Sequence, residues 1–486
     1  MAAHPEDDTA AIFTSGSVMR HVLTMTLTGS AGLMAIFLVD LANLFYISML
    51  GEQVLAAAIG FAGTVMFFSV STTIGIAIAT AALVSRSLGA GDRDRARRLA
   101  GSALAFMVVF TALVAAALLP FLEPILRLLG ATGRTLEVGK DFLTIVVPSM
   151  PLMGIGMGLS SVLRAAGDAR RAMFVTLAGG LISALLDPLL IFGLDLGVTG
   201  AAIATVISRV GFMAVGWYGA VKIHDLVARP RLDHLVADFK PIFAIAGPAV
   251  LTNMATPVGN AYLTASIAPY GDSAVAGWAV VGRIIPVAFG GIFALSGSIG
   301  PIIGQNYGAK LFKRVKRTLI DSLIFMTAYT VIMWLILIAA SSSIITYFGA
   351  TGDGAALISF FCAFASLSFL FNGGIFVSNA VFNTLGYPLL STLFNWGRAT
   401  LGIIPFVWVG GQYWGLIGVM GGWAAGAVVF GLVAVATSFR VVVLVRLRKP
   451  RDTPPPVWRI ALSAFTSGKG AAASWSIPDT HRRNRD

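Results

Sequence analysis

Long apolar runs follow one another along almost the whole chain, and they limit its possible folds more than any other feature. A helix that crosses the hydrocarbon core of a membrane needs about 20 mostly apolar residues. Twelve such runs lie at 20–48, 54–84, 99–120, 139–163, 171–193, 199–222, 241–268, 275–304, 318–340, 355–383, 390–410 and 414–445. They are continuous rather than alternating over ten residues, which excludes a membrane β-barrel. We therefore predict an all-α integral membrane protein with twelve transmembrane helices.

The composition agrees with a membrane protein. Only 12% of the 486 residues are charged and 57% are hydrophobic, whereas soluble proteins carry about 25% charged residues. This composition excludes a soluble enzyme, a disordered chain and a nucleic-acid-binding module. The first 18 residues are polar and acidic, unlike a signal peptide, so the first apolar run is read as a retained helix. Cys362 is the single cysteine and forms no intramolecular disulfide.

The basic residues predict the orientation of the helices. With the N-terminus in the cytosol, 28 of the 34 Lys and Arg residues fall on the cytosolic side. The loops on the other side hold three, namely Arg127, Arg134 and Lys140. Because cytoplasmic loops carry an excess of Lys and Arg, we predict a multi-pass protein of the bacterial inner membrane with both termini cytosolic. The net charge of +12 is then an orientation signal, and nucleic acid is not an expected partner.

The sequence divides into two halves that resemble each other. Leu88-Gly89-Ala90 is matched by Tyr307-Gly308-Ala309, 219 residues further on, and Gly167 is matched by Gly386 at the same offset. Matching loops lie on one side, so each half has six spans, and transporters built this way place the substrate path between the halves. A scaffold is the alternative. We predict five segments: 1–19 (cytosolic), 20–222 (N-lobe), 223–240 (cytosolic connecting loop), 241–448 (C-lobe) and 449–486 (a cytosolic basic tail, disordered).

Three segments of the first half and one of the second resemble a known family. They are LVSRSLGAGDRDRAR (83–97), LRAAGDARRAMFVTL (163–177), LLDPLLIFGLDLGVTGAAIATVIS (185–208) and IIGQNYGAKLFKRVKR (302–317). Together they resemble the MATE multidrug and cation antiporters, in particular the DinF-type branch. The resemblance covers essentially all of 20–448. It implies two six-helix lobes, a central cleft, alternating access and efflux driven by a proton or sodium gradient.

Two acids fall near the middle of predicted spans, Asp40 in the first and Asp187 in the fifth. A carboxylate in the membrane is costly, and its default interpretation is functional; the alternative is a structural acid tied to Ser or Thr. Ser183, four residues before Asp187, lies on the same helix face. Pro188 removes a backbone hydrogen bond one turn away. We predict that these acids bind the coupling cation.

The resemblance adds detail to this site. It implies that Asp187-Pro188 is the protonation site and that Thr205 of the sixth span joins its network. It also places the usual acid of the first span at Asn43, whereas here the carboxylate is one turn earlier, at Asp40. Because positions three apart share a helix face, the pair is exchanged on one surface. The family's proline in the first span is also missing.

The second half has no acid in the middle of its spans and offers amides and arginines instead. We list Arg283, Arg398, Asn260 and Asn379 as candidates that line the substrate cleft. The arginines either face the cleft or extend to the membrane surface. We favour H⁺ over Na⁺ as the coupling ion, because Na⁺ needs several oxygen ligands. We expect no cofactor and no metal site.

These observations predict a monomeric antiporter that exports organic cations or drugs. A Na⁺-coupled exporter of the same family remains an alternative, as does a flippase for lipid-linked oligosaccharides of the wider superfamily. An integral membrane enzyme would need clustered His or Asp near a membrane face, and the five histidines do not cluster within spans.

Overall fold

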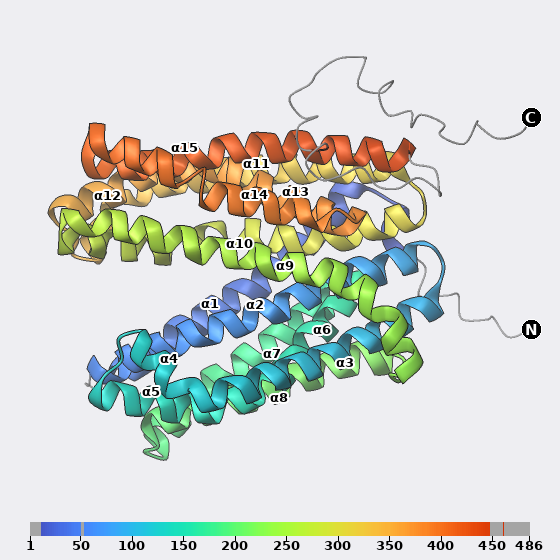
Figure 1. Cartoon of the computed structure of the whole chain (residues 1–486), viewed down its shortest axis with the longest axis horizontal. Coiled ribbons are helices and arrows are strands. Elements are labelled where there is room, and N and C mark those ends of the chain that lie inside the picture. Colours follow the sequence, from blue (N-terminus) through green and yellow to red (C-terminus); the bar gives the residue numbers. More distant parts are fainter. Residues whose placement is uncertain (1–10, 50–52, 448–459, 461–486) are drawn as a thin grey trace, which may run out of the picture.

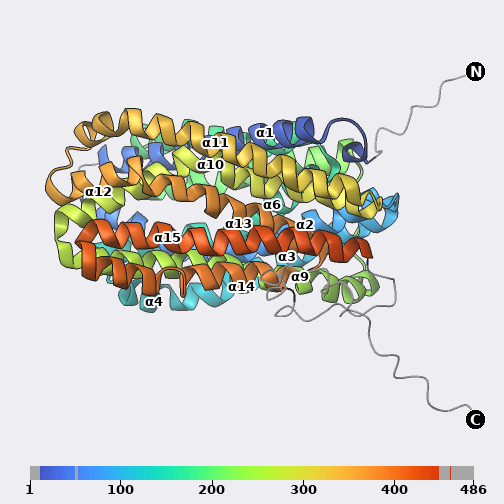
Figure 2. The same cartoon turned by 90° about the horizontal axis from the view of Figure 1, so that it is seen from above.

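The computed structural model describes residues 11–49, 53–447 and 460, and these ranges contain helices but no strand. The helices form two lobes, which Figure 1 shows as a lower and an upper layer. The N-lobe contains α1 (Val18–Met49), α2 (Gln53–Gly89), α3 (Arg93–Leu118), α4 (Leu122–Leu128), α5 (Gly133–Val146), α6 (Met150–Ala166), α7 (Ala169–Pro188) and α8 (Gly197–Trp217). The C-lobe contains α9 (Leu232–Ile267), α10 (Asp272–Gly308), α11 (Phe312–Tyr347), α12 (Gly352–Ala363), α13 (Phe369–Leu385), α14 (Pro388–Ala399) and α15 (Ile404–Leu447). Figure 2 shows α11, α13 and α15 running along the long axis of the C-lobe.

The described ranges hold eleven helical segments that are long and apolar enough to cross a membrane, and the last of them, Pro388–Leu447, contains two spans. Its backbone leaves the helical conformation at Trp414 and at Gly415, where φ is 58°. Beyond this point the chain runs back along itself, as glycine contacts pair Gly410 with Gly418, Phe406 with Gly422 and Gly402 with Gly426. The structure therefore confirms the predicted twelve spans in two six-helix lobes.

The internal repeat is visible in the backbone. Gly167 and Gly386, 219 residues apart, end α6 and α13 with φ of 94° and 91°. Further pairs with positive φ at the same offset are Gly91 and Lys310, Gly130 and Gly349, and Gly133 and Gly352. Turns of this kind are set by local backbone geometry, so the two lobes turn the chain at equivalent places.

The lobes meet where α2 and α10 cross, in a contact that we call the inter-lobe seam. A Cβ added to Gly89 would lie 2.0 Å from the carbonyl oxygen of Gln305, and one added to Gly308 would lie 2.1 Å from that of Arg86. Residues 86 and 305, like 89 and 308, differ by the repeat offset of 219. The two contacts are therefore exchanged by a pseudo-two-fold axis through the seam. From this end, the lobes diverge toward the opposite end (Figure 1).

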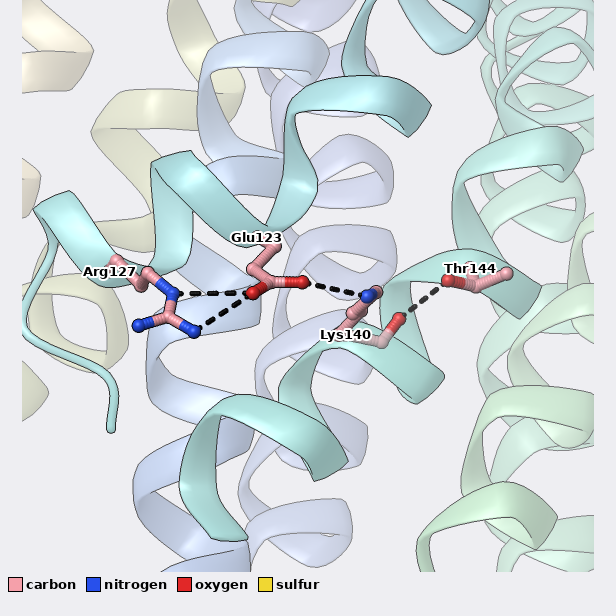
Figure 3. A network of polar contacts seen from close by, with 4 residues as sticks. All are labelled: Glu123, Arg127, Lys140 and Thr144. Atoms are coloured by element: carbon pink, nitrogen blue, oxygen red, sulfur yellow. Dashed lines mark hydrogen bonds and ion pairs between the residues drawn. The ribbon is translucent and has the colours of Figure 1, made fainter. Parts of the chain in front are cut away.

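The two ends of the molecule differ in charge. The end that carries the seam, which we call the basic end, also carries the loops at 90–92, 167–168, 224–231 and 309–311 with their flanking arginines and lysines. At the opposite end, Glu123 accepts from Arg127 (2.9 Å) and from Lys140 (2.8 Å), as Figure 3 shows. Arg134 pairs with Glu137 there. All three basic residues predicted for that side thus lie in ion pairs, and two of them share Glu123.

The expected connecting loop 223–240 is shorter than predicted. The segment Leu232–Lys240 already belongs to α9, so the non-helical connection covers 224–231. The sequence there is too polar to be read as part of a span, but one of its acids, Asp238, is bound to α3. Asp238 is buried, and it binds Arg98 (3.0 Å) and Ser102 (2.8 Å) of α3. At the other boundaries, α1 begins at Val18, and the basic tail lies outside the described residues except for the buried Ile460.

Candidate functional site

Asp187 lies at the end of α7 and is fully buried. The hydroxyl of Ser183 donates to its Oδ2 at 3.3 Å, as the spacing of four residues predicts. Its Oδ1 has no hydrogen-bond partner among the described residues, and no described Lys, Arg or His lies within 4 Å of the carboxyl group. Pro188 follows, and a π-helical turn over Leu189–Gly193 ends the span. Burying a charge without partners is costly, so binding a cation or a proton would stabilise this carboxyl group.

The first helix runs parallel to α7 along this site. Gly32 of α1 abuts Thr176 of α7, and Val39 abuts Gly180 one to two turns further on. Continuing this spacing brings the α1 backbone near Asn43 level with Asp187, and that of Asp40 one turn nearer the basic end. The side chains of Asp40 and Asn43 lie outside the described part of the structure, so their exchanged roles stay a prediction.

Thr205 belongs to α8, which packs antiparallel to α7. Contacts of Gly200 with Leu190 and of Gly211 with Ile182 bring Thr205 to the level of Asp187. Its hydroxyl donates to the carbonyl oxygen of Ala201 in its own helix at 2.9 Å. The structure therefore joins Ser183 to Asp187 by a hydrogen bond but does not join Thr205 to them.

The C-lobe contains a buried amide cluster between α13 and α14. Asn395 donates to Oδ1 of Asn379 at 3.0 Å, and Ser391 donates to Oδ1 of Asn383 at 3.1 Å. All four side chains are buried. Hydrogen-bonded amides of this kind rigidify a core, so Asn379 already has a partner within the lobe.

Arg398 follows this cluster one turn along α14, on the same helix face as Asn395. It is only 8% exposed. One guanidinium nitrogen donates to the hydroxyl of Thr256 on α9 at 3.3 Å, and no described carboxylate lies within 4 Å. A buried arginine without a counter-charge in a membrane is costly and marks a functional position by default.

Asn260 and Arg283 lie further along the two C-lobe helices, α9 and α10, that contact the N-lobe. On α9, Ala246 and Val250 contact Gly75 of α2, and the same face continues at Asn260, which is exposed. On α10, Gly290 contacts Met34 of α1, and the same face continues two turns on at the exposed Arg283. Both side chains are exposed and lie beyond these contacts, toward the end where the lobes have diverged.

Arg86 is an inter-lobe residue that the sequence analysis counted only as an orientation charge. From α2 it donates to the carbonyl oxygens of Thr384 and, at 3.2 Å, of Asn383 on α13, and it lies 5.6 Å from the ring centre of Tyr307. Gln305 of α10 reaches the other way and donates to the carbonyl oxygen of Ala165 at 2.8 Å. The repeated Leu-Gly-Ala and Tyr-Gly-Ala motif was the sequence signal for this contact.

Comparisons with known proteins agree with this architecture. The MatE family model matches residues 30–189 and 248–409. An FAD transporter of Shewanella oneidensis is 30% identical over 418 residues, which cover 84% of this chain and 91% of the relative. The multidrug export protein MepA of Staphylococcus haemolyticus is 25% identical, over 85% of this chain and 92% of the relative.

Solved structures share the fold. The MATE transporter VcmN of Vibrio cholerae in its bent form superimposes with a TM-score of 0.84 at 23% identity, over 88% of this chain and 98% of that one. A multidrug resistance MATE transporter in an outward-facing conformation gives a TM-score of 0.84 at 19% identity, over 90% and 99%. With twelve spans in two related lobes and the family match in both of them, this chain belongs to the MATE family of membrane transporters and is not an enzyme.

Proposed function

We propose that this transporter exports small organic molecules, organic cations and drugs among them, in exchange for protons. The observation that carries the proposal is Asp187, a fully buried carboxyl group in a membrane-spanning helix with one oxygen lacking a partner among the described residues. Acids within the membrane are costly and mark ion pathways by default. The relatives named as multidrug exporters support the direction and class of transport.

Alternating access supplies the cycle that we propose. We propose that Asp187 is reached from one side at a time, because the lobes are in contact at the basic end and diverge toward the opposite end. A protonated carboxyl group is neutral, and burying it costs less than burying the ion. Proton binding therefore changes the relative free energy of the two lobe arrangements. We further propose that the basic end faces the cytosol of a bacterial inner membrane and that the transporter works as a monomer.

The proton is favoured over sodium by the surroundings of Asp187. A sodium ion in a transporter is coordinated by several oxygens. Among the described residues, the Ser183 hydroxyl is the one oxygen that forms a hydrogen bond with this carboxyl group. Asp40 in the adjacent helix is the second acid that we propose for coupling, with Asn43 and Thr205 nearby. A sodium-coupled cycle would have to draw its ligands from these residues.

For the substrate, we propose that Arg283, Arg398, Asn260 and Asn379 of the C-lobe contribute to the path between the lobes. One observation favours a second substrate class, namely anionic molecules. Arg398 is buried and has no described counter-ion, Arg283 is exposed within a span, and a relative 30% identical is named as an FAD transporter. A phosphate or carboxylate group would supply the missing negative charge.

Reconstituted proteoliposomes test the coupling. With an imposed pH gradient and no sodium, wild type is expected to move an ethidium-type cation and Asp187→Asn to lose that movement. Asp195→Asn is the matched control, because Asp195 is an exposed acid just beyond the same helix. Unchanged proton-driven efflux by Asp187→Asn would sink the proposed role, and efflux that requires sodium but no pH gradient would replace the proton by sodium.

A further inference from the structure

The residues before the first helix, 11–17, pack into the junction between the two lobes at the basic end, and we call them the N-terminal strap. Ile12–Thr14 form one 3-10 turn. Phe13 is only 2% exposed and belongs to the apolar core of the C-lobe. The Phe13 ring and the aliphatic side chain of Ile12 also lie against Gly167, which ends α6 of the N-lobe. A short segment preceding a helix has no need of such burial unless it holds the helix in place.

Side chains of α10 fix the backbone of Phe13. Its N–H donates to Oε1 of Gln305 at 2.9 Å, and its carbonyl oxygen accepts from Nδ2 of Asn306 at 3.1 Å. Gln305 also donates to the carbonyl oxygen of Ala165 in the N-lobe. One glutamine thus connects the strap, α10 and α6.

Arg314 of α11 binds the same segment from a second helix. Its guanidinium group donates to the carbonyl oxygens of Phe13 (2.7 Å), Ser15 (2.8 Å) and Gly16 (2.9 Å), and to Oδ1 of Asn306 (2.9 Å). Hydrogen bonds from a charged donor are the stronger kind. The strap is therefore held by the C-lobe while its chain continues directly into α1, which packs against α7 of the N-lobe.

We infer that the N-terminal strap is a releasable latch that stabilises the arrangement in which the basic end is closed. Separating the lobes at that end pulls α1 and α6 away from α10 and α11. The strap cannot follow both sides, so Phe13 leaves its site or the Arg314 and Gln305 bonds break. This inference rests on the alternating access proposed above, and it assigns to the strap part of the free-energy difference between the two arrangements.

A buried cysteine reports on opening of the basic end. Ser85 of α2 is fully buried against Gly304 of α10 in the inter-lobe seam. We would place Ser85→Cys in a Cys362→Ser background and measure the rate of maleimide labelling from the basic-end side of proteoliposomes. Ser298→Cys is a second reporter, because Ser298 is buried and donates to the carbonyl oxygen of Met25 across the lobes.

Phe13→Ala and Arg314→Ala are expected to raise the labelling rate about tenfold, which corresponds to about 1.4 kcal/mol. Lys316→Ala is the matched control, since it removes an exposed charge from the same helix and is expected to leave the rate unchanged. Each variant is checked for a monodisperse elution profile, and two independent strap variants guard against misfolding of either one.

The outcomes separate the latch from the transport cycle. Equal labelling rates in wild type and both strap variants, with proton-driven efflux intact, would overturn the latch and leave the proposed function standing. If neither reporter is ever labelled, with or without the strap contacts, the basic end does not open, and the alternating access itself is wrong.

Discussion

In the N-lobe, α7 carries the buried Asp187, whereas the stretch of the C-lobe that corresponds to it within one residue is Pro405-Phe406-Val407, which is entirely apolar. Conversely, the C-lobe holds the amides Asn379, Asn383 and Asn395, for which the repeat offset of 219 gives Ser160, Arg164 and Thr176 in the N-lobe. The backbone turns are shared, but the buried polar groups are not. The comparison teaches that the repeat fixes the scaffold, while titratable and hydrogen-bonding chemistry can be assigned to the lobes separately.

The largest expected effect comes from the acid that only the N-lobe carries. Asp187→Asn should lower proton-driven efflux about a hundredfold or more, the range seen when an essential proton-transfer group is removed. Asn395→Ala should instead leave the dependence on the pH gradient intact and change the apparent substrate affinity. Efflux rates measured against external pH separate the two effects. Loss of pH dependence in Asn395→Ala would contradict the assignment of proton coupling to the N-lobe alone.

Replacing the buried arginine of each lobe should lower the stability of the protein by different amounts. Arg209 of the N-lobe donates to the Val146 carbonyl oxygen (2.9 Å) and the Ser149 hydroxyl (2.8 Å), whereas Arg398 of the C-lobe donates to Thr256 at 3.3 Å. Bonds from charged donors contribute about 1.5–3 kcal/mol each. We expect Arg209→Gln to destabilise the protein by about 3 kcal/mol and Arg398→Gln by about 1 kcal/mol. Thermal unfolding in detergent measures both, and the reverse order would make Arg398 the structural residue.

The seam tests how symmetric the lobes are. Gly89→Ala and Gly308→Ala each push a Cβ against a backbone oxygen of the other lobe, at nearly equal distances. Overpacking of this kind costs about 1–3 kcal/mol, so the two variants should lose similar stability. Gly297→Ala on α10 is the control, because nothing lies within 4 Å of the added Cβ. A large difference between the two seam variants in thermal unfolding would contradict the pseudo-symmetry.

The smallest effect concerns the N-cap of α7. Burial acts to raise the pKa of Asp168, but hydrogen bonds from His224 and Arg171 outweigh it and hold that pKa below its ordinary value. A lowered pKa in the folded state stabilises the protein above the unfolded value of about 4, and this contribution is lost as pH falls through the folded pKa.

Asn caps a helix as well as Asp does, so Asp168→Asn removes the negative charge that binds Arg171 and His224 rather than the cap. It should therefore cost about 1 kcal/mol at pH 7, the upper end for a partly exposed ion pair, and progressively less below about pH 4. The repeat offset gives Tyr387 at the N-cap of α14, and Tyr387→Phe should show no such pH dependence. Unfolding curves recorded between pH 7 and pH 3 test the pair. A constant difference for Asp168→Asn across that range would be inconsistent with the lowered pKa.

Much of the fold follows from local patterns in the sequence. Apolar runs give the spans, and the fixed offset between Gly167 and Gly386 gives the two lobes. The contact of Ser183 with Asp187 is also local, because residues four apart share a helix face. The hydrogen bond of Thr205 is equally local, since its hydroxyl donates to the carbonyl oxygen of Ala201 in its own helix, and its place in the cation-binding network stays a prediction.

The rest depends on contacts between distant parts of the chain. Arg86 reaches Thr384, and Phe13 reaches Gln305, each across nearly 300 residues. No spacing rule predicts which surface an exposed-looking arginine or a short leading segment will meet. The same holds for the buried Asp238, whose pairing with Arg98 turns an apparent loop into the start of a helix.

The exchange of contacts in the seam, Gly89 with Gln305 and Gly308 with Arg86, has the form of an isologous interface, in which residue i touches residue j and j touches i. That is how two identical subunits meet in a two-fold dimer. The seam thus has the form of a two-fold dimer interface, although the two halves that meet there differ in sequence. Because both halves belong to one chain, a substitution in one half need not occur in the other, so one lobe can carry an acid and the other amides at positions that do not correspond.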